Sequence, residues 1–292
     1  MNGFLLIDKE RGLSSFDVVK RLKYLTREAH VGHTGTLDPL ATGLLVIAFG
    51  EATKLVEYFM GCDKEYEVRA VFGKVSDSYD ADGEITVVDE KIYVDEEKIA
   101  EIIQKNFTGK ITQIPPKYSA LKIKGKRACD IMREGGDVEM KARTVDIYKY
   151  AVLEFDWPKV SFRVKCSTGT YIRSLVHDLG QILKCGGYVE ELRRTKVDDF
   201  SVDVARRVKE FEGQGYKIEK YLISLEEIGR KFHKIDLTEE DFDAMKDGKT
   251  LLSKKIDQQK TYVAYNSGLL AGVLESGKDG KGIKFRKLIV RE

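Results

Sequence analysis

Two strand-like segments that follow each other directly constrain the fold of this chain most. TVDIYKYAVLEF (144–155) and KVSFRVKCS (159–167) both alternate polar and apolar residues, and only a short turn near Trp157 and Pro158 separates them. Strands joined by so short a turn pair antiparallel, because parallel pairing requires a long crossover. Amphipathic stretches typical of helices cover residues 14–27, 96–107 and 170–184. This mixture predicts an α+β fold in which helices flank a mixed, mostly antiparallel sheet.

The pattern changes around residues 213–235, which we interpret as a closing segment and linker. Beyond it, Gly-rich turns separate three short strand-like segments, TYVAYN (261–266), LLAGVLE (269–275) and IKFRKLIV (283–290). A chain of 292 residues is long enough for one large and one small domain. We therefore predict a large domain over residues 1–230 and a small β-rich domain over residues 233–292.

The composition disfavours membrane and secreted classes of protein. The longest apolar stretch runs from Leu44 to Phe49, whereas a membrane-spanning helix needs roughly 20 apolar residues. The first residues, MNGFLLIDKERG, carry no basic leader of the kind that precedes a signal peptide core. The 4 cysteines are widely spaced and include no CxxC pair, which is typical of reduced thiols. We therefore expect a cytoplasmic protein.

The positive charges are unevenly distributed, although the net charge is only +2. The segment KYSALKIKGKR (117–127) contains Tyr118 and five cations, among them Lys122, Lys124 and Lys126, and it contains no acid. Such a local positive surface suits an arm that lies on nucleic-acid phosphates. The ordinary alternative is a solvated surface hairpin.

The densest motif is GHTGTLDPLATGLL, residues 32–45. Its glycines and Pro39 predict that residues 29–43 form a long loop. Asp38 and Pro39 alone would be compatible with an ordinary Gly-rich turn. A phosphate-binding P-loop is excluded, because no Lys followed by Ser or Thr comes after the second glycine. His30 and His33 could begin a metal site, but no cluster of Cys or His completes a ligand set. We therefore expect no metal and no cofactor.

The complete string of residues 32–45 is similar to the signature loop of the pseudouridine synthases that act on tRNA uridine-55 and of their guide-RNA relatives. Four further segments resemble the same family in the same order, and a fifth, ELRRT (191–195), resembles a late pocket segment. The four are DKERGLSS (8–15), CDKEYEVR (62–69), IPPKYSALK (114–122) and GTYIRSLVHDLG (169–180). The resemblance covers roughly residues 3–230. Glu10 is a departure, since the family usually has Pro there.

The resemblance implies roles for individual residues. Asp38 corresponds to the catalytic carboxylate, Tyr66 to the active-site tyrosine and Arg173 to the active-site arginine. Further residues are implied to contact the substrate, namely His33, Lys9, Tyr171 and Leu192. Residues 109–142 would form an insertion that contacts RNA. Residues 233–292 resemble the small RNA-binding domain called PUA.

The implied reaction, isomerisation of uridine-55 in the T-arm loop, needs the chemistry that these residues carry. A carbon–nitrogen bond breaks and a carbon–carbon bond to the same ribose forms, so one ionised carboxylate suffices, as nucleophile or as base. Arg173 in a bidentate pair would keep Asp38 ionised. Tyr66 would stack on the uracil that is flipped out of the RNA, and its phenol could help remove the proton from ring carbon five.

Each of these roles has an ordinary alternative. Arg173 could be a surface arginine on a helix, and Tyr66 a half-buried strand tyrosine. His33 is implied to pack against the disrupted RNA loop, but a histidine in a turn also serves as a local hydrogen bonder. Two functional alternatives remain: a non-catalytic tRNA-binding folding factor and a guide-RNA-dependent synthase subunit. We expect tRNA as the partner, no obligate protein partner and a monomer.

Overall fold

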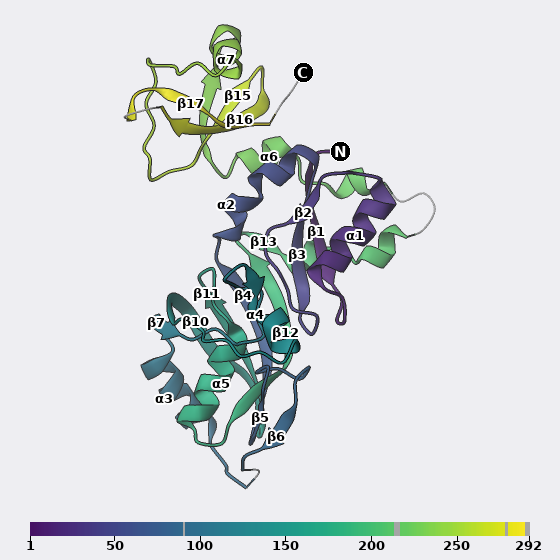
Figure 1. Cartoon of the computed structure of the whole chain (residues 1–292), viewed down its shortest axis with the longest axis vertical. Helices are drawn as coiled ribbons and strands as arrows, with labels where there is room; N and C mark the ends of the chain where they lie inside the picture. Colours follow the sequence, from purple (N-terminus) through teal and green to yellow (C-terminus); the bar gives the residue numbers. More distant parts are fainter. Residues whose placement is uncertain (90, 213–216, 278–279, 290–292) are drawn as a thin grey trace.

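A large β-sheet runs through most of the molecule, and a second, smaller sheet lies at the C-terminal end (Figure 1). The computed structural model describes residues 1–89, 91–212, 217–277 and 280–289. The strands of the large sheet are β1 (Gly3–Lys9), β2 (Val31–His33), β3 (Thr42–Phe49), β4 (Lys64–Phe72), β7 (Gly109–Gln113), β10 (Arg143–Asp156), β11 (Lys159–Cys166), β12 (Gly187–Val197) and β13 (Phe200–Ser201). The smaller sheet is built from β14 (His233–Leu237), β15 (Tyr262–Asn266), β16 (Leu269–Ser276) and β17 (Ile283–Leu288).

Two short hairpins and a set of helices complete the described chain. The hairpins pair β5 (Lys74–Ser76) with β6 (Ile85–Val87), and β8 (Lys122–Ile123) with β9 (Lys126–Arg127). The α-helices are α1 (Ser15–Thr26), α2 (Val56–Met60), α3 (Glu96–Asn106), α4 (Ala128–Arg133), α5 (Ile172–Ile182), α6 (Leu225–Gly229) and α7 (Glu239–Lys246). Short 3-10 helices cover η1 (Gly50–Leu55), η2 (Val202–Val204), η3 (Val208–Phe211) and η4 (Ile218–Tyr221). Among the described helices, none is long and apolar enough to span a membrane.

The large sheet has the strand order β1-β3-β12-β4-β11-β10-β7, with β2 paired to β3 and β13 to β12. The pairing of β3 with β12 is parallel, whereas the other pairs in this sheet are antiparallel. The hairpin of β10 and β11 pairs Asp156 with Lys159 across its turn, which confirms the strand pair expected there. The mixed, mostly antiparallel sheet and the α+β class are therefore confirmed.

The helices cover the large sheet because each has one apolar face. In α1, Val18 and Leu22 are fully buried, and Ser14 with Asp17 forms a reciprocal cap at its start. α5 buries seven residues, which is possible because the sheet, α3 and the loops enclose it. One core therefore joins α1, α3 and α5 to the same side of the sheet, and this is the side where the signature motifs gather.

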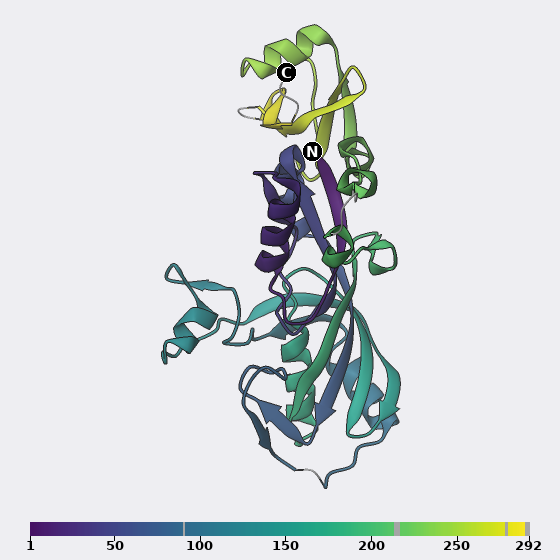
Figure 2. The same ribbon diagram turned by 90° about the vertical axis from the view of Figure 1, so that its right-hand side faces the viewer.

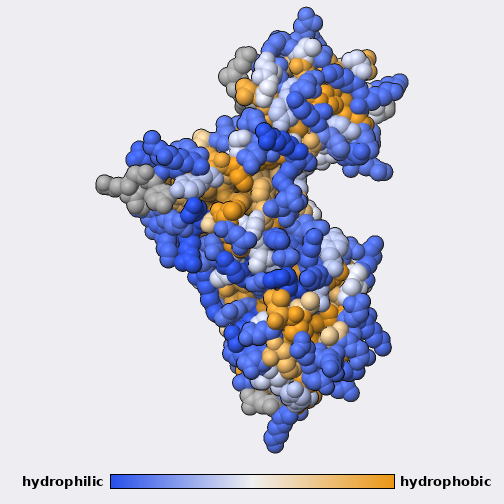
Figure 3. Space-filling view, turned by 180° about the vertical axis from the view of Figure 1, so that it is seen from behind, coloured by the Kyte–Doolittle hydropathy of each residue, from blue (hydrophilic) through white to orange (hydrophobic). Residues whose placement is uncertain are grey.

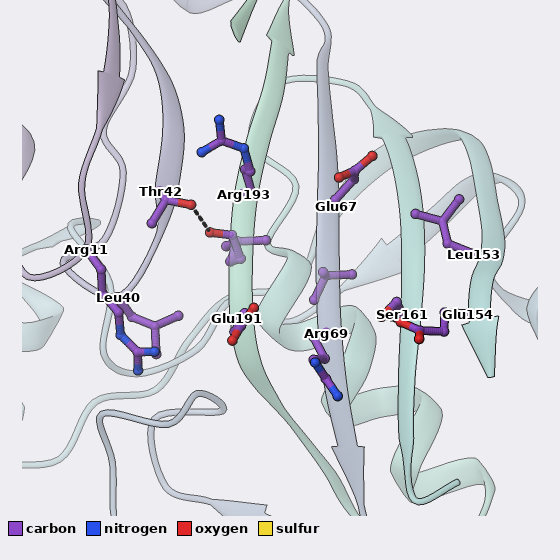
Figure 4. A pocket seen from close by; sticks show the side chains of 12 residues that line it. Arg11, Leu40, Thr42, Glu67, Arg69, Leu153, Glu154, Ser161, Glu191 and Arg193 are labelled. Atoms are coloured by element: carbon purple, nitrogen blue, oxygen red, sulfur yellow. Dashed lines mark hydrogen bonds between the residues drawn. The ribbon is translucent and has the colours of Figure 1, made fainter. Parts of the chain in front are cut away.

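The opposite side of the β4–β10 half carries no helix (Figure 1), and its surface combines hydrophilic residues with a hydrophobic patch (Figure 3). A hollow of about 550 Å³ lies on this face. Figure 4 shows the side chains that line it, and there Thr42 donates a hydrogen bond to the carbonyl of Leu192. Charged side chains from neighbouring strands, including Glu67, Arg69 and Glu191, line the hollow. None of the predicted catalytic residues lies there.

Two details of the predicted secondary structure are wrong. Residues 29–43 were expected to form one long loop, but Val31–His33 is a strand that pairs with the end of β3. The C-terminal region was expected to have three strands, whereas β14 pairs parallel with β15 and α7 follows it. β14 is mostly exposed and so short that its sequence shows no clear alternation. Part of the predicted linker, residues 213–216, lies outside the described residues.

A projecting arm leaves the body of the molecule between β7 and β10 (Figure 2). It contains the β8–β9 hairpin and α4, and it corresponds to the insertion predicted over residues 109–142. At its base, the Tyr118 carbonyl accepts a hydrogen bond from Arg173 of α5, and Tyr118 and Ser119 line a cavity together with Asp38. The arm therefore begins beside the signature loop.

Candidate active site

The signature loop between β2 and β3 is held in place through its backbone carbonyls. Arg194 on β12 is 2% exposed, and its guanidinium donates to the carbonyls of Gly35, Thr36 and Leu44 at 3.0, 3.3 and 2.7 Å. From the other side, the Ser15 hydroxyl accepts from the backbone N–H of Leu37 at 2.8 Å. These contacts fix the loop immediately before Asp38.

Glycine is required where this loop enters β3. Gly43 has φ +97°, and a Cβ there would lie 2.3 Å from the carbonyl oxygen of Arg194. The close approach accompanies the parallel register in which Gly43 faces Arg194 across β3 and β12. Only glycine satisfies both conditions.

Arg173 joins two carboxylates that lie far apart in the sequence. Its Nη2 lies 2.9 Å from Oδ2 of Asp38, and its Nη1 lies 3.0 Å from Oδ2 of Asp80. The expected bidentate pair with Asp38 is therefore wrong, because the guanidinium divides its two nitrogens between two acids. Nη1 and Nη2 also donate to the carbonyls of Ser78 and Tyr118. Arg173 is 4% exposed, so it is a buried connector and not a surface arginine.

Asp80 is a site residue that the sequence did not reveal. It is 4% exposed and accepts hydrogen bonds from the Ser78 hydroxyl at 2.6 Å and from the Asp82 backbone at 3.1 Å. Its segment, DSYDADG, has the composition of an ordinary turn. The only available signal is a cluster of acids close to a predicted strand end, and this signal is weak.

A cavity of about 330 Å³ brings Asp38, Arg173, Tyr66, Tyr171 and Leu192 together. These residues come from the signature loop, from the start of α5, from β4 and from β12, so four separate segments of chain converge. The Asp38 side chain is 40% exposed, and it is therefore accessible from the cavity. Five of the predicted residues thus share one site.

Tyr66 lies on the wall of this cavity in a half-buried position on β4. Burial raises the pKa of its phenol, and the guanidinium of Arg194 beside it opposes that rise. The phenol is therefore protonated at neutral pH, with a cation next to its oxygen.

The remaining predicted contacts lie around this cavity. His33 and Tyr118 line an adjacent cavity of about 610 Å³, which Asp38 and Arg173 also line. The Nδ1 of His33 accepts a hydrogen bond from the Gly35 backbone at 3.2 Å, so His33 does stabilise the turn. Burial lowers the pKa of His33, which favours the neutral imidazole.

Lys9 lies beneath the signature loop and outside the lining of both cavities. It is 1% exposed, and its ammonium donates to the carbonyls of Leu13 at 2.6 Å and Pro39 at 3.4 Å. Burial lowers its pKa to about 8, against the opposing charge of Asp38. In this position Lys9 supports the loop from below.

The arm is less uniformly positive than its sequence suggests. Its cations form ion pairs with acids further along the same arm, Lys117 with Asp137, Lys126 with Glu134 and Arg127 with Asp130. Lys122 and Lys124 are exposed and form no ion pair with any described residue. The acids of residues 130–137 lie outside the acid-free run, so the run alone could not reveal these pairs.

Comparison with protein families identifies the chain. Residues 23–172 match the N-terminal domain model of the TruB family of pseudouridylate synthases. Residues 173–227 match a model described as the tRNA pseudouridylate synthase B C-terminal domain. Together the two models cover the signature loop, both sides of the cavity and Arg173.

Curated relatives resemble the chain over nearly its whole length. The tRNA pseudouridine synthase B of Clostridium tetani is 37% identical over 99% of this chain and 100% of its own length. That of Clostridium acetobutylicum is 40% identical, over 91% of this chain and 92% of the relative.

Solved structures share the fold at lower sequence identity. An H/ACA RNP bound to a substrate RNA containing 2′-deoxyuridine has a TM-score of 0.72 at 23% identity, over 99% of this chain and 85% of that chain. A Cbf5-Nop10-Gar1 complex has a TM-score of 0.71, also at 23% identity, with the same coverage. Sequence and fold agree: the chain belongs to the TruB family of pseudouridylate synthases, and it is therefore an isomerase.

Proposed function

We propose that this enzyme converts uridine-55 in the T-arm loop of tRNA into pseudouridine. The name that the curated relatives carry, tRNA pseudouridine synthase B, supports the tRNA substrate. The observation that carries the proposal is the pairing of Asp38 with buried Arg173 in a cavity that also contains Tyr66. A protein that only bound tRNA would have no need of this set.

In the proposed reaction, Asp38 acts on the flipped nucleotide. The bond between N1 and the ribose carbon breaks, and a bond from C5 to that same carbon forms. The proton of C5 leaves, and N1 ends with a proton, so that the product is an isomer of the substrate. One carboxylate serves, as nucleophile or as base, and Arg173 fixes its orientation.

Tyr66 has two proposed roles in this reaction. Its ring is a platform for the flipped uracil. Its phenol takes part in removing the proton from C5. Because burial keeps the phenol protonated, its own proton first passes through water to N1 of the uracil, and its oxygen then accepts the proton from C5. Arg194 beside the phenol favours the negative charge that develops on its oxygen.

Recognition of the tRNA involves the arm and the C-terminal region. We propose that the arm over 109–142 lies on the RNA backbone, with Lys122 and Lys124 free to contact phosphates. Residues 1–230 are then the catalytic domain, and residues 233–292 are a PUA-like RNA-binding domain. Its four-stranded sheet with one added helix is compatible with this role.

The test is mass-spectrometric mapping of pseudouridine in an unmodified tRNA transcript after incubation with the purified protein alone. We expect pseudouridine at position 55. Asp38→Asn should abolish it while tRNA binding changes by less than about tenfold, roughly 1.4 kcal/mol. Asp156→Asn, an exposed change at the end of β10, is the control and should be fully active.

Three other results would each contradict the proposal. Tight binding without pseudouridine in the wild type would favour the folding factor. Activity that appears only with an added guide RNA would favour the guide-dependent class. Appreciable pseudouridine from Asp38→Asn would remove Asp38 from its central role.

A further inference from the structure

The catalytic cavity contains more positive charge than its own residues neutralise. Lys64, Arg143, Arg173 and Arg194 line it, and Asp38 is the one carboxylate among the described lining residues. Arg173 is already paired with Asp38 and Asp80. Arg194 already donates hydrogen bonds to three backbone carbonyls within residues 32–45. Within the part of the chain that the structure describes, Lys64 and Arg143 therefore remain as cations without an acidic partner.

Lys64 is a nearly buried ammonium at the start of β4. It is 8% exposed, and it donates to the carbonyls of Met60 at 2.7 Å and Cys62 at 2.5 Å. An ammonium has three N–H donors, so one remains for another acceptor. Burial lowers its pKa, and the guanidinium of Arg194 lowers it further.

Arg143, at the start of β10, has a guanidinium that forms no hydrogen bond with the described residues. Its Nε and Nη2 atoms are buried and have no partner, and its central carbon lies 4.5 Å from the ring centre of Tyr171. Burial lowers its pKa as well. A ligand that binds Arg143 would therefore have no existing hydrogen bond to break. Unpaired buried polar atoms of this kind are costly, and in a native protein they call for an explanation.

The two cations belong to one continuous wall. The Met60 carbonyl that accepts from Lys64 also accepts from the Thr168 hydroxyl at 2.8 Å. The next residue, Gly169, lies against Arg143, since a Cβ on it would be 3.4 Å from Nη1. Gly169 has φ +82°, a backbone conformation that residues with a side chain rarely adopt. The wall thus runs from Lys64 through residues 167–170 to Arg143.

We propose that this wall binds a backbone phosphate of the RNA strand next to the flipped nucleotide. The inference rests on the proposed RNA substrate. A nucleotide that enters the cavity carries phosphodiester groups with it, and such an anion supplies the charge that Lys64 and Arg143 lack. The fork of an arginine and the point charge of a lysine are both suited to phosphate oxygens. Both residues position the substrate and do not touch the reacting atoms.

The experiment replaces single phosphates by uncharged methylphosphonates at the three linkages nearest the target uridine of a T-arm stem-loop. If one of these phosphates binds the wall, the wild type should lose roughly 10- to 100-fold in kcat/KM when that linkage is neutral. This is the loss expected for one hydrogen bond between charged groups, and it should come mainly from a higher KM. Arg143→Gln should lose a similar factor on the natural RNA. On the RNA with the neutral linkage, the kcat/KM of Arg143→Gln should be less than about threefold below that of the wild type, because the same contact is already missing.

Controls separate this site from a structural role. Lys149→Gln, an exposed change on the same strand, should show neither the loss nor the coupling. Arg143→Gln should melt at the wild-type temperature or above it, because it removes an uncompensated charge. If that variant does not fold, Arg143→Lys, which keeps the charge and loses the fork, should give an intermediate loss with the same linkage dependence.

The phosphate site and the proposed function fail in different ways. If the wild type does not modify the natural stem-loop, the proposed function is wrong. If it does, but no neutral linkage reduces kcat/KM, or the losses from Arg143→Gln and the neutral linkage multiply fully, then this wall does not bind a phosphate.

Discussion

Individual residues in this site are defined by what surrounds them more than by their type. Arg173, Arg194, Lys64 and Lys9 are all basic and nearly buried, yet they have four different arrangements. Arg173 joins two carboxylates, Arg194 binds carbonyls, Lys64 faces the cavity, and Lys9 lies beneath the loop. The resemblance to the family identifies Arg173 and Lys9 as site residues. Only the structure shows that Arg173 joins two carboxylates whereas Lys9 holds the loop from beneath.

The two proposed roles of Tyr66 can be separated by two substitutions. Tyr66→Phe keeps the ring and loses the oxygen, so RNA binding should change little while turnover falls by roughly 10²- to 10⁴-fold. RNA deuterated at ring carbon five should then show an isotope effect that the wild type lacks. Tyr66→Leu should also weaken binding of the flipped base by roughly 1–3 kcal/mol. Wild-type turnover by Tyr66→Phe would leave the ring as the only contribution.

Lys9 makes a prediction about stability and pH. Its pKa is about 8 in the folded chain against 10.5 as the ordinary value, so between these pH values only the unfolded chain holds the proton. Stability attributable to Lys9 therefore rises as pH rises through this window. The free energy of unfolding of the wild type, relative to Lys9→Met, should increase by about 1–2 kcal/mol from pH 8 to pH 9.5.

Urea unfolding of both proteins at several pH values measures this difference. Lys20→Met, an exposed change on α1, is the control and should show a constant difference from the wild type. A constant difference for Lys9→Met as well would mean that its ammonium is not desolvated.

Among the elements, the arm shows how pairing within an element alters its expected role. Three of its cations already have acidic partners in the arm, whereas Lys122 and Lys124 do not. Exposed ion pairs contribute little energy, so these pairs reduce the affinity of the cations for phosphate without abolishing it. The cations of the arm therefore differ in how available they are for RNA, and Lys122 and Lys124, without an acidic partner among the described residues, lie in the β8–β9 hairpin.

The salt dependence of tRNA binding should differ between the lysines with and without an acidic partner. Neutralising Lys122 and Lys124 together should reduce the slope of log K against log salt by about 1.4–1.8, the value for two phosphate contacts. Lys126→Gln, the matched change at a paired lysine, should reduce it by less than about 0.7. Equal effects per lysine would show that the pair between Lys126 and Glu134 opens on binding, and an unchanged slope would show that the hairpin faces solvent.

The elements that the sequence predicts well are those whose pattern is local. The alternation in residues 144–167 and the apolar face of residues 170–184 suffice for β10, β11 and α5. Asp80 could not be found in this way, because its partner Arg173 is distant in the chain and its own segment has the composition of a turn. β2 and β14 are short strands stabilised by their neighbours in the sheets, and a propensity pattern does not include that contribution.

On the scale of the whole molecule, the two sheets share a core. Phe4, Phe59 and Phe200 from the large sheet and its helices pack in one apolar cluster with Val263, Leu270 and Ile289 from the C-terminal region. At the edge of this cluster, Glu57 forms ion pairs with Arg286 and Lys287. Figure 3 shows a hollow between the C-terminal region and the lower part of the large domain on one side. We expect the two regions to unfold together.

Leu270→Ala tests this coupling, because the single tryptophan lies in the other region. Trp157 stacks on Phe72 with the ring centres 5.3 Å apart, so its fluorescence reports on the large sheet. The cavity left by Leu270→Ala should lower the thermal midpoint of this signal by roughly 5–10 °C. Leu252→Ala, 72% exposed in the same C-terminal region, should not. An unchanged Trp157 midpoint with Leu270→Ala would show that the regions unfold separately.

The parallel pairing of β3 with β12 also governs when an active enzyme can exist during synthesis on the ribosome. It joins Thr42 to Leu192, which are 150 positions apart, and β12 also supplies Arg194 to the signature loop. A growing chain therefore contains Asp38 early, but its loop lacks the hydrogen bonds from Arg194, and its cavity lacks the wall that Leu192 and Arg194 form, until β12 emerges. A nascent chain that has not yet emerged as far as β12 therefore cannot modify RNA.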